Sequence, residues 1–304
     1  MKSFINNLKE SFKAGNFLTK LIYINVGVFM VVNLALYICL WTKTSTHWLQ
    51  YLELPAFLPS LWKQPWSLLT YMFLHTHFAH LIFNLIALYY FGQLFLHYFS
   101  QKQLVAVYIW GGLAGAAAYL AAFMLIPHFS SLRMVSYLLG ASASVMAILF
   151  AAVAYAPNQT VQVTLIGEVR LKYIGLAFLA IDLLGLGAIN SGGSISHLGG
   201  ALMGYIFALC LQKGNDISLP ITRIIDWIVN HWPTGILQPK KHIKVTVNNT
   251  ANMSDAEWNR QQKQQAQKRQ ERIDQILEKI KKSGYQNLTD EEKKSLFDLS
   301  KTEK

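Results

Sequence analysis

Charged side chains are scarce in this sequence. Only 14% of its 304 residues are Asp, Glu, Lys or Arg, against roughly a quarter in an ordinary soluble domain. The shortage is confined to residues 1–212, which carry four acidic and ten basic residues, whereas residues 213–304 carry twelve and seventeen. With 53% hydrophobic residues, this distribution argues against a disordered chain, a nucleic-acid-binding tail protein or a typical cytosolic enzyme. It predicts a membrane domain followed by a charged, soluble tail.

Cysteine is almost absent, because the chain has only Cys39 and Cys210, both inside apolar runs. No disulfide framework is therefore expected. Residues 1–20 are polar and basic, and no small-residue cleavage site closes the apolar run after them, so we expect no cleavable signal peptide. The basic residues of the tail are interleaved with acids, as on an ordinary solvated helix, so we expect no nucleic-acid partner.

Long apolar runs recur along the first two thirds of the chain and predict six transmembrane helices. A bilayer core about 30 Å thick needs about 20 apolar residues in a helix. Such runs lie near residues 21–41, 78–99, 104–126, 139–155, 173–188 and 197–212. The fourth and sixth are short and rich in Gly and Ala, so we expect both to be buried among the others. The sequence thus predicts an all-α polytopic membrane protein.

The polar segments around these runs define four predicted parts of the chain. They are a cytoplasmic N-terminal segment (1–20), a six-span membrane domain (21–212), an amphipathic helix with a linker (213–250) and a small helical cytoplasmic tail (251–304). Residues 217–232 carry Pro220 in a first helical turn and isoleucines at helical spacing, which indicates an amphipathic helix. This helix lies either on the inner membrane surface or against the tail. In the tail, a helical pattern covers about 254–282, and Thr289 begins a second helix.

Lys and Arg near the span ends predict the orientation in the membrane. They are in excess in the amino-terminal segment, in the loops after the second and fourth spans, and in the tail. We therefore expect both termini in the cytoplasm. The second, fourth and sixth spans then all enter the membrane from its outer face.

Polar groups open these three spans at one expected depth. His80 lies at the entry of the second span, with Asn84 one turn further on. Ser142 opens the fourth span and His197 opens the sixth. Polar groups in hydrocarbon are unfavourable unless they are paired or functional. Their shared depth indicates a site, although each residue alone is more typical of packing or anchoring.

A hydroxyl and an imidazole on separate spans provide the parts of a nucleophilic site. Ser142 supplies the hydroxyl and His197 the base, provided that the fourth and sixth spans pack closely. Small residues permit that approach: Gly140 at the start of the fourth span, and Gly200 and Gly204, four apart, on the sixth.

Further donors are available for an oxyanion. The amino-terminal amides of the fourth span, including that of Ser142, point toward the reaction centre, where a helix end favours negative charge. His80 and Asn84, at i and i+4, share a helix face and add side-chain donors. Ser142 and Ser144 face nearly opposite directions, so only one of them meets His197, and geometry alone leaves the choice open.

A rival interpretation is a metal site or a transporter built on His75, His77 and His80. Their spacing is not that of a helical zinc protease, and no Glu lies among them. On a helix, positions 75 and 77 would point apart. We therefore expect neither a metal ion nor a cofactor.

The three motifs resemble those of the rhomboid family of intramembrane serine proteases, over about residues 20–212. Residues 80–84 are similar to the family's His-x-x-x-Asn. Gly140-Ala141-Ser142 is similar to its Gly-x-Ser and selects Ser142, and residues 197–204 are similar to its His-x-x-Gly-x-x-x-Gly. Each motif is weak by itself, but three in this order are specific.

The resemblance implies a six-helix rhomboid-like bundle with a Ser142–His197 dyad in a water-filled cavity open to the outside. It also implies an oxyanion site made by His80, Asn84 and backbone amides near Ser142. The expected activity is serine endopeptidase cleavage of single-span membrane proteins near the outer face, in the inner membrane of a bacterium. The alternative is a catalytically silent rhomboid-like protein that binds membrane helices.

Two departures and one extra acid stand outside the family pattern. Ala143 follows the serine where the family often has Gly, and Trp66 is followed by Ser67 where many members have Arg, which concerns the anchoring of the outer loop. Asp182 in the fifth span belongs to no motif. Asp182 could orient a catalytic group, line the substrate entry or hydrogen-bond within the bundle. We favour the last, and expect Asp182→Asn to leave most cleavage intact. The glycine-containing fifth span is a candidate for a movable gate.

Overall fold

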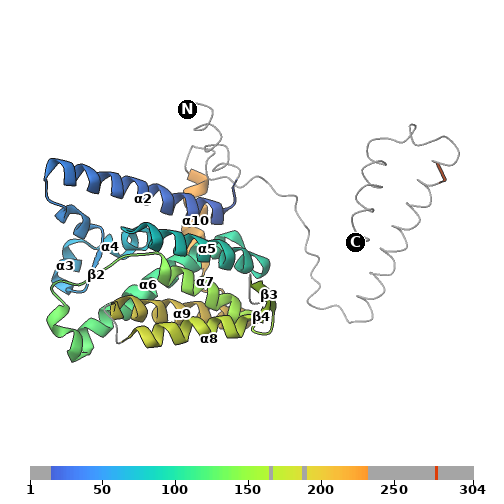
Figure 1. Ribbon diagram of the computed structural model, residues 1–304. Coiled ribbons are helices and arrows are strands. Elements are labelled where there is room, and N and C mark those ends of the chain that lie inside the picture. The colour runs from blue at the N-terminus through green and yellow to red at the C-terminus, as the bar shows by residue number, and fades with distance from the viewer. Residues whose placement is uncertain (1–14, 164–166, 187–189, 232–277, 280–304) are drawn as a thin grey trace. The chain divides into compact units, whose positions relative to one another are not determined.

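The computed structural model describes residues 15–163, 167–186, 190–231 and 278–279 (Figure 1). The chain divides into two units, 1–240 and 241–304, and nearly all described residues belong to the first. The elements of the first unit are α2 (Phe17–Thr42), η1 (His47–Tyr51), β1 (Leu54–Pro55), α3 (Leu58–Lys63), α4 (Ser67–Thr70), η2 (Tyr71–Phe73), α5 (Phe78–Tyr98), α6 (Gln101–Leu125), η3 (Pro127–Leu132), β2 (Tyr137–Leu138), α7 (Ser142–Tyr155), β3 (Thr160–Val163), β4 (Gly167–Arg170), α8 (Leu171–Gly185), α9 (Ser191–Gln212) and α10 (Leu219–His231).

Six of these helices coincide with the six predicted spans. Within the described residues, α2, α5, α6 and α9 are long and apolar enough to cross a membrane. The other two, α7 and α8, are shorter, with 14 and 15 residues. Large apolar side chains such as Leu34, Tyr90 and Leu184 are exposed on the outer faces of α2, α5 and α8. Such a surface suits lipid rather than water, and the all-α polytopic membrane fold is confirmed.

Helix α7 is the central helix of the bundle and packs against α5, α6 and α9 (Figure 1). Residues 143–152 are all buried, as predicted for the fourth span. Small residues bring the helices together, since a Cβ at Gly111 of α6 would lie 2.3 Å from the Cβ of Ala147. A helix surrounded in this way can be shorter than the bilayer is thick, because its polar ends are enclosed by protein.

Helix α9 begins earlier than predicted. The sequence placed the sixth span at 197–212 and treated it as too short for a full crossing, but α9 has 22 residues from Ser191 onward. Its first turns contain Gly and Ser, which are typical of a loop. They are helical because small residues let α9 lie directly on α6, where a Cβ at Gly192 would come 2.8 Å from Cε2 of Tyr119.

The loop between α2 and α5 is held in place by hydrogen bonds around Trp66. Trp66 Nε1 donates to the carbonyl of Tyr51 at 2.8 Å, and Thr70 Oγ1 donates to that of Leu52 at 2.7 Å. The short strand β1 pairs antiparallel with β2, with Leu54 opposite Leu138. This pairing fixes the chain just before it turns into α7.

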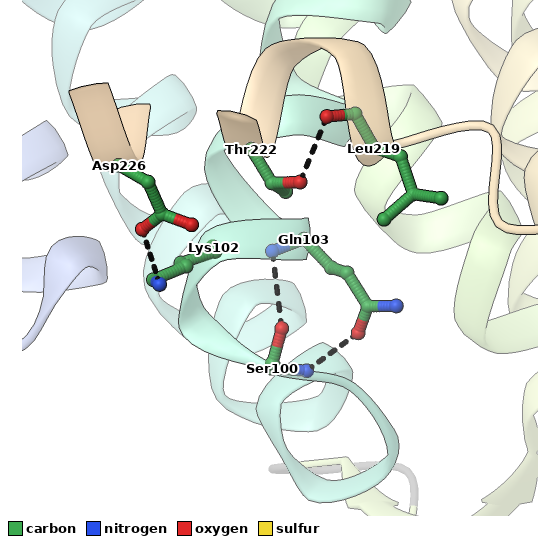
Figure 2. Close-up of polar contacts among 6 residues, drawn as sticks. All are labelled: Ser100, Lys102, Gln103, Leu219, Thr222 and Asp226. Atoms are coloured by element: carbon green, nitrogen blue, oxygen red, sulfur yellow. Dashed lines mark hydrogen bonds and ion pairs between the residues drawn. The ribbon is translucent and has the colours of Figure 1, made fainter. Parts of the chain in front are cut away.

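The predicted amphipathic helix at 217–232 is α10, and it packs on the beginning of α6. Figure 2 shows the Nζ of Lys102 on α6 beside Asp226 on α10, next to the Ser100–Gln103 capping box that starts α6. Gln103 also donates to Asp216 at 3.0 Å. Trp227 remains exposed, which leaves an apolar surface available to the membrane.

Several sequence-based predictions fall outside the described residues. They concern most of the N-terminal segment 1–20, the linker after residue 231 and the tail from residue 251. Of the helix predicted over 254–282, only residues 278 and 279 are described, and both are helical.

Candidate functional site

A cavity of about 630 Å³ is lined by residues of α5, α7, α8 and α9. The four polar residues predicted for the site, Ser142, His197, His80 and Asn84, all line it. Aromatic side chains of α5 and α8 form part of its wall, with the rings of Phe91 and Phe178 packed edge to face at 5.6 Å. The three motifs, far apart in the sequence, therefore meet in one place.

A sharp turn at Gly140 directs the chain into α7. Gly140 has φ +124°, and its amide donates to the carbonyl of Tyr71 at 2.9 Å. A Cβ at this position would lie 2.8 Å from Cε1 of His80. Only glycine therefore fits, both for its backbone conformation and for the space beside His80. The turn leaves Ser142 as the first residue of α7, and no side chain caps that helix end.

Ser142 and His197 are in hydrogen-bond contact. The Oγ of Ser142 lies 2.6 Å from the Nε2 of His197. Both side chains are partly exposed to the cavity. A hydroxyl in contact with an imidazole that can accept its proton is the arrangement of an activated nucleophile.

Close packing of α7 on α9 produces this contact. A Cβ at Gly200 would lie 2.1 Å from the carbonyl oxygen of Ala143, and one at Gly204 would lie 2.0 Å from that of Ala147. The two backbones therefore touch along one face of each helix, as close-packed membrane helices with small residues do. The first of these contacts lies beside Ser142 and one turn from His197, so backbone packing fixes the distance between the two side chains.

The structure distinguishes between the two serines that geometry alone left open. Ser144 is 1% exposed, and its Oγ has no hydrogen-bond partner among the described residues. It faces the interior of the bundle, whereas Ser142 faces the cavity and His197. Of the two serines, Ser142 is the one in contact with His197.

His80 and Asn84 line the same cavity from the first two turns of α5. Asn84 Nδ2 donates to the backbone carbonyl of His80 at 2.9 Å, which holds the amide on the face that it shares with His80. The distance from the Gly140 Cβ position shows that the His80 ring lies against the turn that precedes Ser142. His80 is therefore close enough to this turn to donate to a charge that develops there, and Asn84 lines the same cavity.

The histidines of the rival metal interpretation do not converge. His75 is completely buried, and its ring packs edge to face on that of His80 at 5.0 Å. His77 instead contacts the hydroxyl of Thr76 at 3.1 Å through Nδ1. Among the described residues, no group of three His, Cys, Asp or Glu side chains is arranged to hold a metal ion.

Sequence reasoning missed the partner of Asp182. We favoured a hydrogen bond within the bundle over orientation of a catalytic group, and the hydrogen bond that Asp182 makes is to His197, with Oδ1 2.7 Å from Nδ1. The motifs did not indicate His197 as the partner, because Asp182 belongs to none of them. A usable signal was present, since Asp182 is the only carboxylate in the sequence of the six spans, and such a residue inside a membrane is by default a functional one.

Comparison with known proteins identifies the family of the membrane domain. The family model described as the Rhomboid domain matches residues 62–214, which contain the whole site. A family of unknown function (DUF6576) matches residues 255–302. The chain is 28% identical over 158 residues to RHOMBOID-like protein 12, mitochondrial, of Arabidopsis thaliana. That match covers 49% of this chain and 47% of the plant protein, so the chain spans about half the length of this relative. From the domain match and the helical membrane fold together, the chain belongs to the rhomboid family.

Proposed function

We propose that this protein is a serine endopeptidase that cuts the membrane-spanning segments of single-span membrane proteins. The observation that carries the proposal is the 2.6 Å contact between Ser142 Oγ and His197 Nε2 inside a cavity at the end of a buried helix. In this proposal Ser142 is the nucleophile and His197 the general base. Membership of the rhomboid family supports the assignment.

The proposed reaction has two stages. His197 accepts the proton of Ser142 as Oγ attacks the scissile carbonyl, and it then gives that proton to the leaving amine. The result is an acyl-enzyme ester on Ser142 and a released carboxyl-terminal fragment. A water molecule, deprotonated by His197, hydrolyses the ester and regenerates the hydroxyl. The cavity of about 630 Å³ has room for both peptide and water.

The oxyanion of each tetrahedral intermediate has donors nearby. The first amides of α7, which no side chain caps, point toward the cavity from the positive end of the helix. His80 and Asn84 line the same cavity from α5. Donors of this kind are most effective in a site that excludes bulk water, because they are already oriented when the charge develops.

The substrate must expose its backbone to Ser142, but a transmembrane helix keeps its carbonyls in internal hydrogen bonds. We therefore propose substrates whose single helix unwinds easily near the outer face, with Gly or Pro in the span and a small residue at the cleavage point.

The proposed setting is the inner membrane of a bacterium, with both termini in the cytoplasm. The supporting observation is the excess of Lys and Arg in the N-terminal segment, two of the loops and the tail. Protease protection of an N-terminal tag in sealed inverted vesicles tests this orientation, since a cytoplasmic tag is digested there and an external one is protected.

The activity is tested with purified protein in liposomes that contain a panel of single-span substrates with destabilised helices. Wild type, Ser142→Ala, Ser144→Ala and His197→Ala are compared side by side. We expect cleavage by wild type and Ser144→Ala, and none by Ser142→Ala or His197→Ala. A fluorophosphonate probe should label the same two active proteins.

Two results would overturn the proposal. If cleavage survives in Ser142→Ala but not in Ser144→Ala, the nucleophile is Ser144 and the proposed assignment is wrong. Absence of both cleavage and labelling in wild type, together with stable binding of the substrates, would favour the silent helix-binding protein.

A further inference from the structure

One buried group has no part in the reaction described above. The carboxylate of Asp182 is 6% exposed and lies in the last turn of α8. An unpaired carboxylate in that position would be strongly unfavourable. Its Oδ1 is 2.7 Å from the Nδ1 of His197, on the edge of the imidazole ring away from Ser142.

From this geometry we infer that Asp182 is a positioning residue for His197, so that the site is a Ser142–His197–Asp182 triad rather than a dyad. The inference rests on the proposed protease function for its catalytic meaning. Three helices then contribute to one line of hydrogen bonds: α7 the hydroxyl, α9 the imidazole and α8 the carboxylate.

The first effect of Asp182 is to select the tautomer of His197. An ionised carboxylate only accepts hydrogen bonds, so the Nδ1 that contacts it must carry a proton. In a neutral imidazole the other nitrogen, Nε2, then has a free lone pair. That nitrogen is the one beside Ser142 Oγ, and the lone pair is what a general base needs. Without the carboxylate, the proton is free to reside on Nε2, where the ring cannot accept the serine proton.

The second effect concerns charge. His197 becomes an imidazolium when it accepts the proton of Ser142, and the carboxylate of Asp182 then faces a positive charge instead of a neutral ring. This attraction is stronger in the transition state than in the ground state, so it increases kcat rather than substrate affinity.

A purely structural role makes different predictions. Asp182 also joins α8 to α9, and in a purely structural role its loss would act only by loosening that interface. Ser194 offers a matched control, because it faces α8 on the same side of α9: a Cβ at Gly185 would lie 2.5 Å from Ser194 Oγ. Ser194→Ala disturbs the α8–α9 contact without touching His197.

The kinetic test compares wild type, Asp182→Asn, Asp182→Glu and Ser194→Ala in liposomes. We expect Asp182→Asn to lower kcat about 10²- to 10⁴-fold with KM nearly unchanged. Asp182→Glu, which keeps the carboxylate, should recover part of that loss, and Ser194→Ala should resemble wild type. Wild-type kcat in Asp182→Asn overturns the triad and leaves the proposed protease function intact. An equal loss in Asp182→Asn and Ser194→Ala also overturns it and assigns Asp182 a structural role.

A spectroscopic test needs no turnover. In detergent-solubilised protein with ¹⁵N-labelled histidine, the signals of His197, assigned by their absence from His197→Ala, report which ring nitrogen carries the proton. We expect the Nδ1–H tautomer in wild type and a shift toward Nε2–H in Asp182→Asn. An unchanged tautomer overturns the inference. Because this result does not depend on cleavage, it separates failure of the triad from failure of the proposed protease function.

Discussion

At the scale of single residues, Gly140 is subject to two independent constraints. Its φ of +124° lies where side-chain-bearing residues are rarely found, and its missing Cβ leaves room for the ring of His80. Gly140 therefore allows the ring of His80, a proposed oxyanion donor, to lie against the start of α7. Its neighbour Ala141 has ordinary backbone angles, so the conformational demand falls on Gly140 alone.

Gly140→Ala should destabilise the fold by about 1–3 kcal/mol and should abolish cleavage, because the new methyl group displaces His80. Thermal unfolding in detergent and cleavage in liposomes provide the two measurements. Gly167 is a matched control: it has φ +94°, but no atom lies within 4 Å of its Cβ position. Gly167→Ala should therefore show the strain without the loss of activity. Full activity in Gly140→Ala would contradict a role for His80 at this turn.

The sequence predicted some residues of the site and missed another, for a physical reason. Ser142, His197, His80 and Asn84 lie in the first two turns of alternate helices, which begin at the same end of the bundle, so topology brings them close together. Asp182 lies near the end of α8, and its contact depends on the rotation of that helix about its own axis. Weakly patterned apolar helices give no sequence signal for that rotation, because lipid and protein interior are both apolar.

At the scale of the helices, the backbone contact between α7 and α9 determines the geometry of the site. Gly200 and Gly204 form one edge of α9, and carbonyl oxygens of α7 fill the space that side chains would occupy. A wider separation of the two helices would move the hydroxyl of Ser142 away from His197.

Gly204→Ala should destabilise the bundle by about 1–3 kcal/mol, as other overpacked cores do, and should reduce cleavage although Gly204 is two turns from His197. Gly27 in α2 is the control, because nothing lies within 4 Å of its Cβ position. Gly27→Ala should leave activity unchanged and be neutral or slightly stabilising. Unfolding by denaturant in mixed micelles measures both effects. Equal stability of Gly204→Ala and Gly27→Ala would show that α7 and α9 can move apart without cost, which contradicts the predicted overpacking.

Helix positions were easier to predict from the sequence than helix ends. Length and hydropathy located α2, α5, α6, α7 and α8 because each contains a clear apolar run. The start of α9 was missed because residues 191–196 contain two glycines and three serines. These residues are helical because their small side chains fit against α6, and that fit depends on a neighbouring helix rather than on local propensity.

At the scale of the whole molecule, every group of the proposed site lies between residues 80 and 197. The C-terminal region that matches the family of unknown function begins at residue 255. A chain that ends after α10, at residue 231, should therefore retain cleavage. The measurement is the rate of cleavage in liposomes, with the same truncation carrying Ser142→Ala as the blank. Loss of activity in the truncated protein, with α10 still helical, would assign the tail a part in catalysis.

Helix α8 contributes both Asp182 and the ring of Phe178 to the same cavity. A single helix therefore carries both part of the cavity wall, through Phe178, and the carboxylate proposed to orient His197. If α8 is the gate for the proposed substrate, an outward tilt of this helix would also stretch the hydrogen bond between Asp182 and His197, and its return would restore that bond. The open position of α8 would then admit substrate while His197 lacks its hydrogen bond to Asp182. The closed position would restore this bond, so Ser142 would be fully activated only after α8 had closed on the bound substrate.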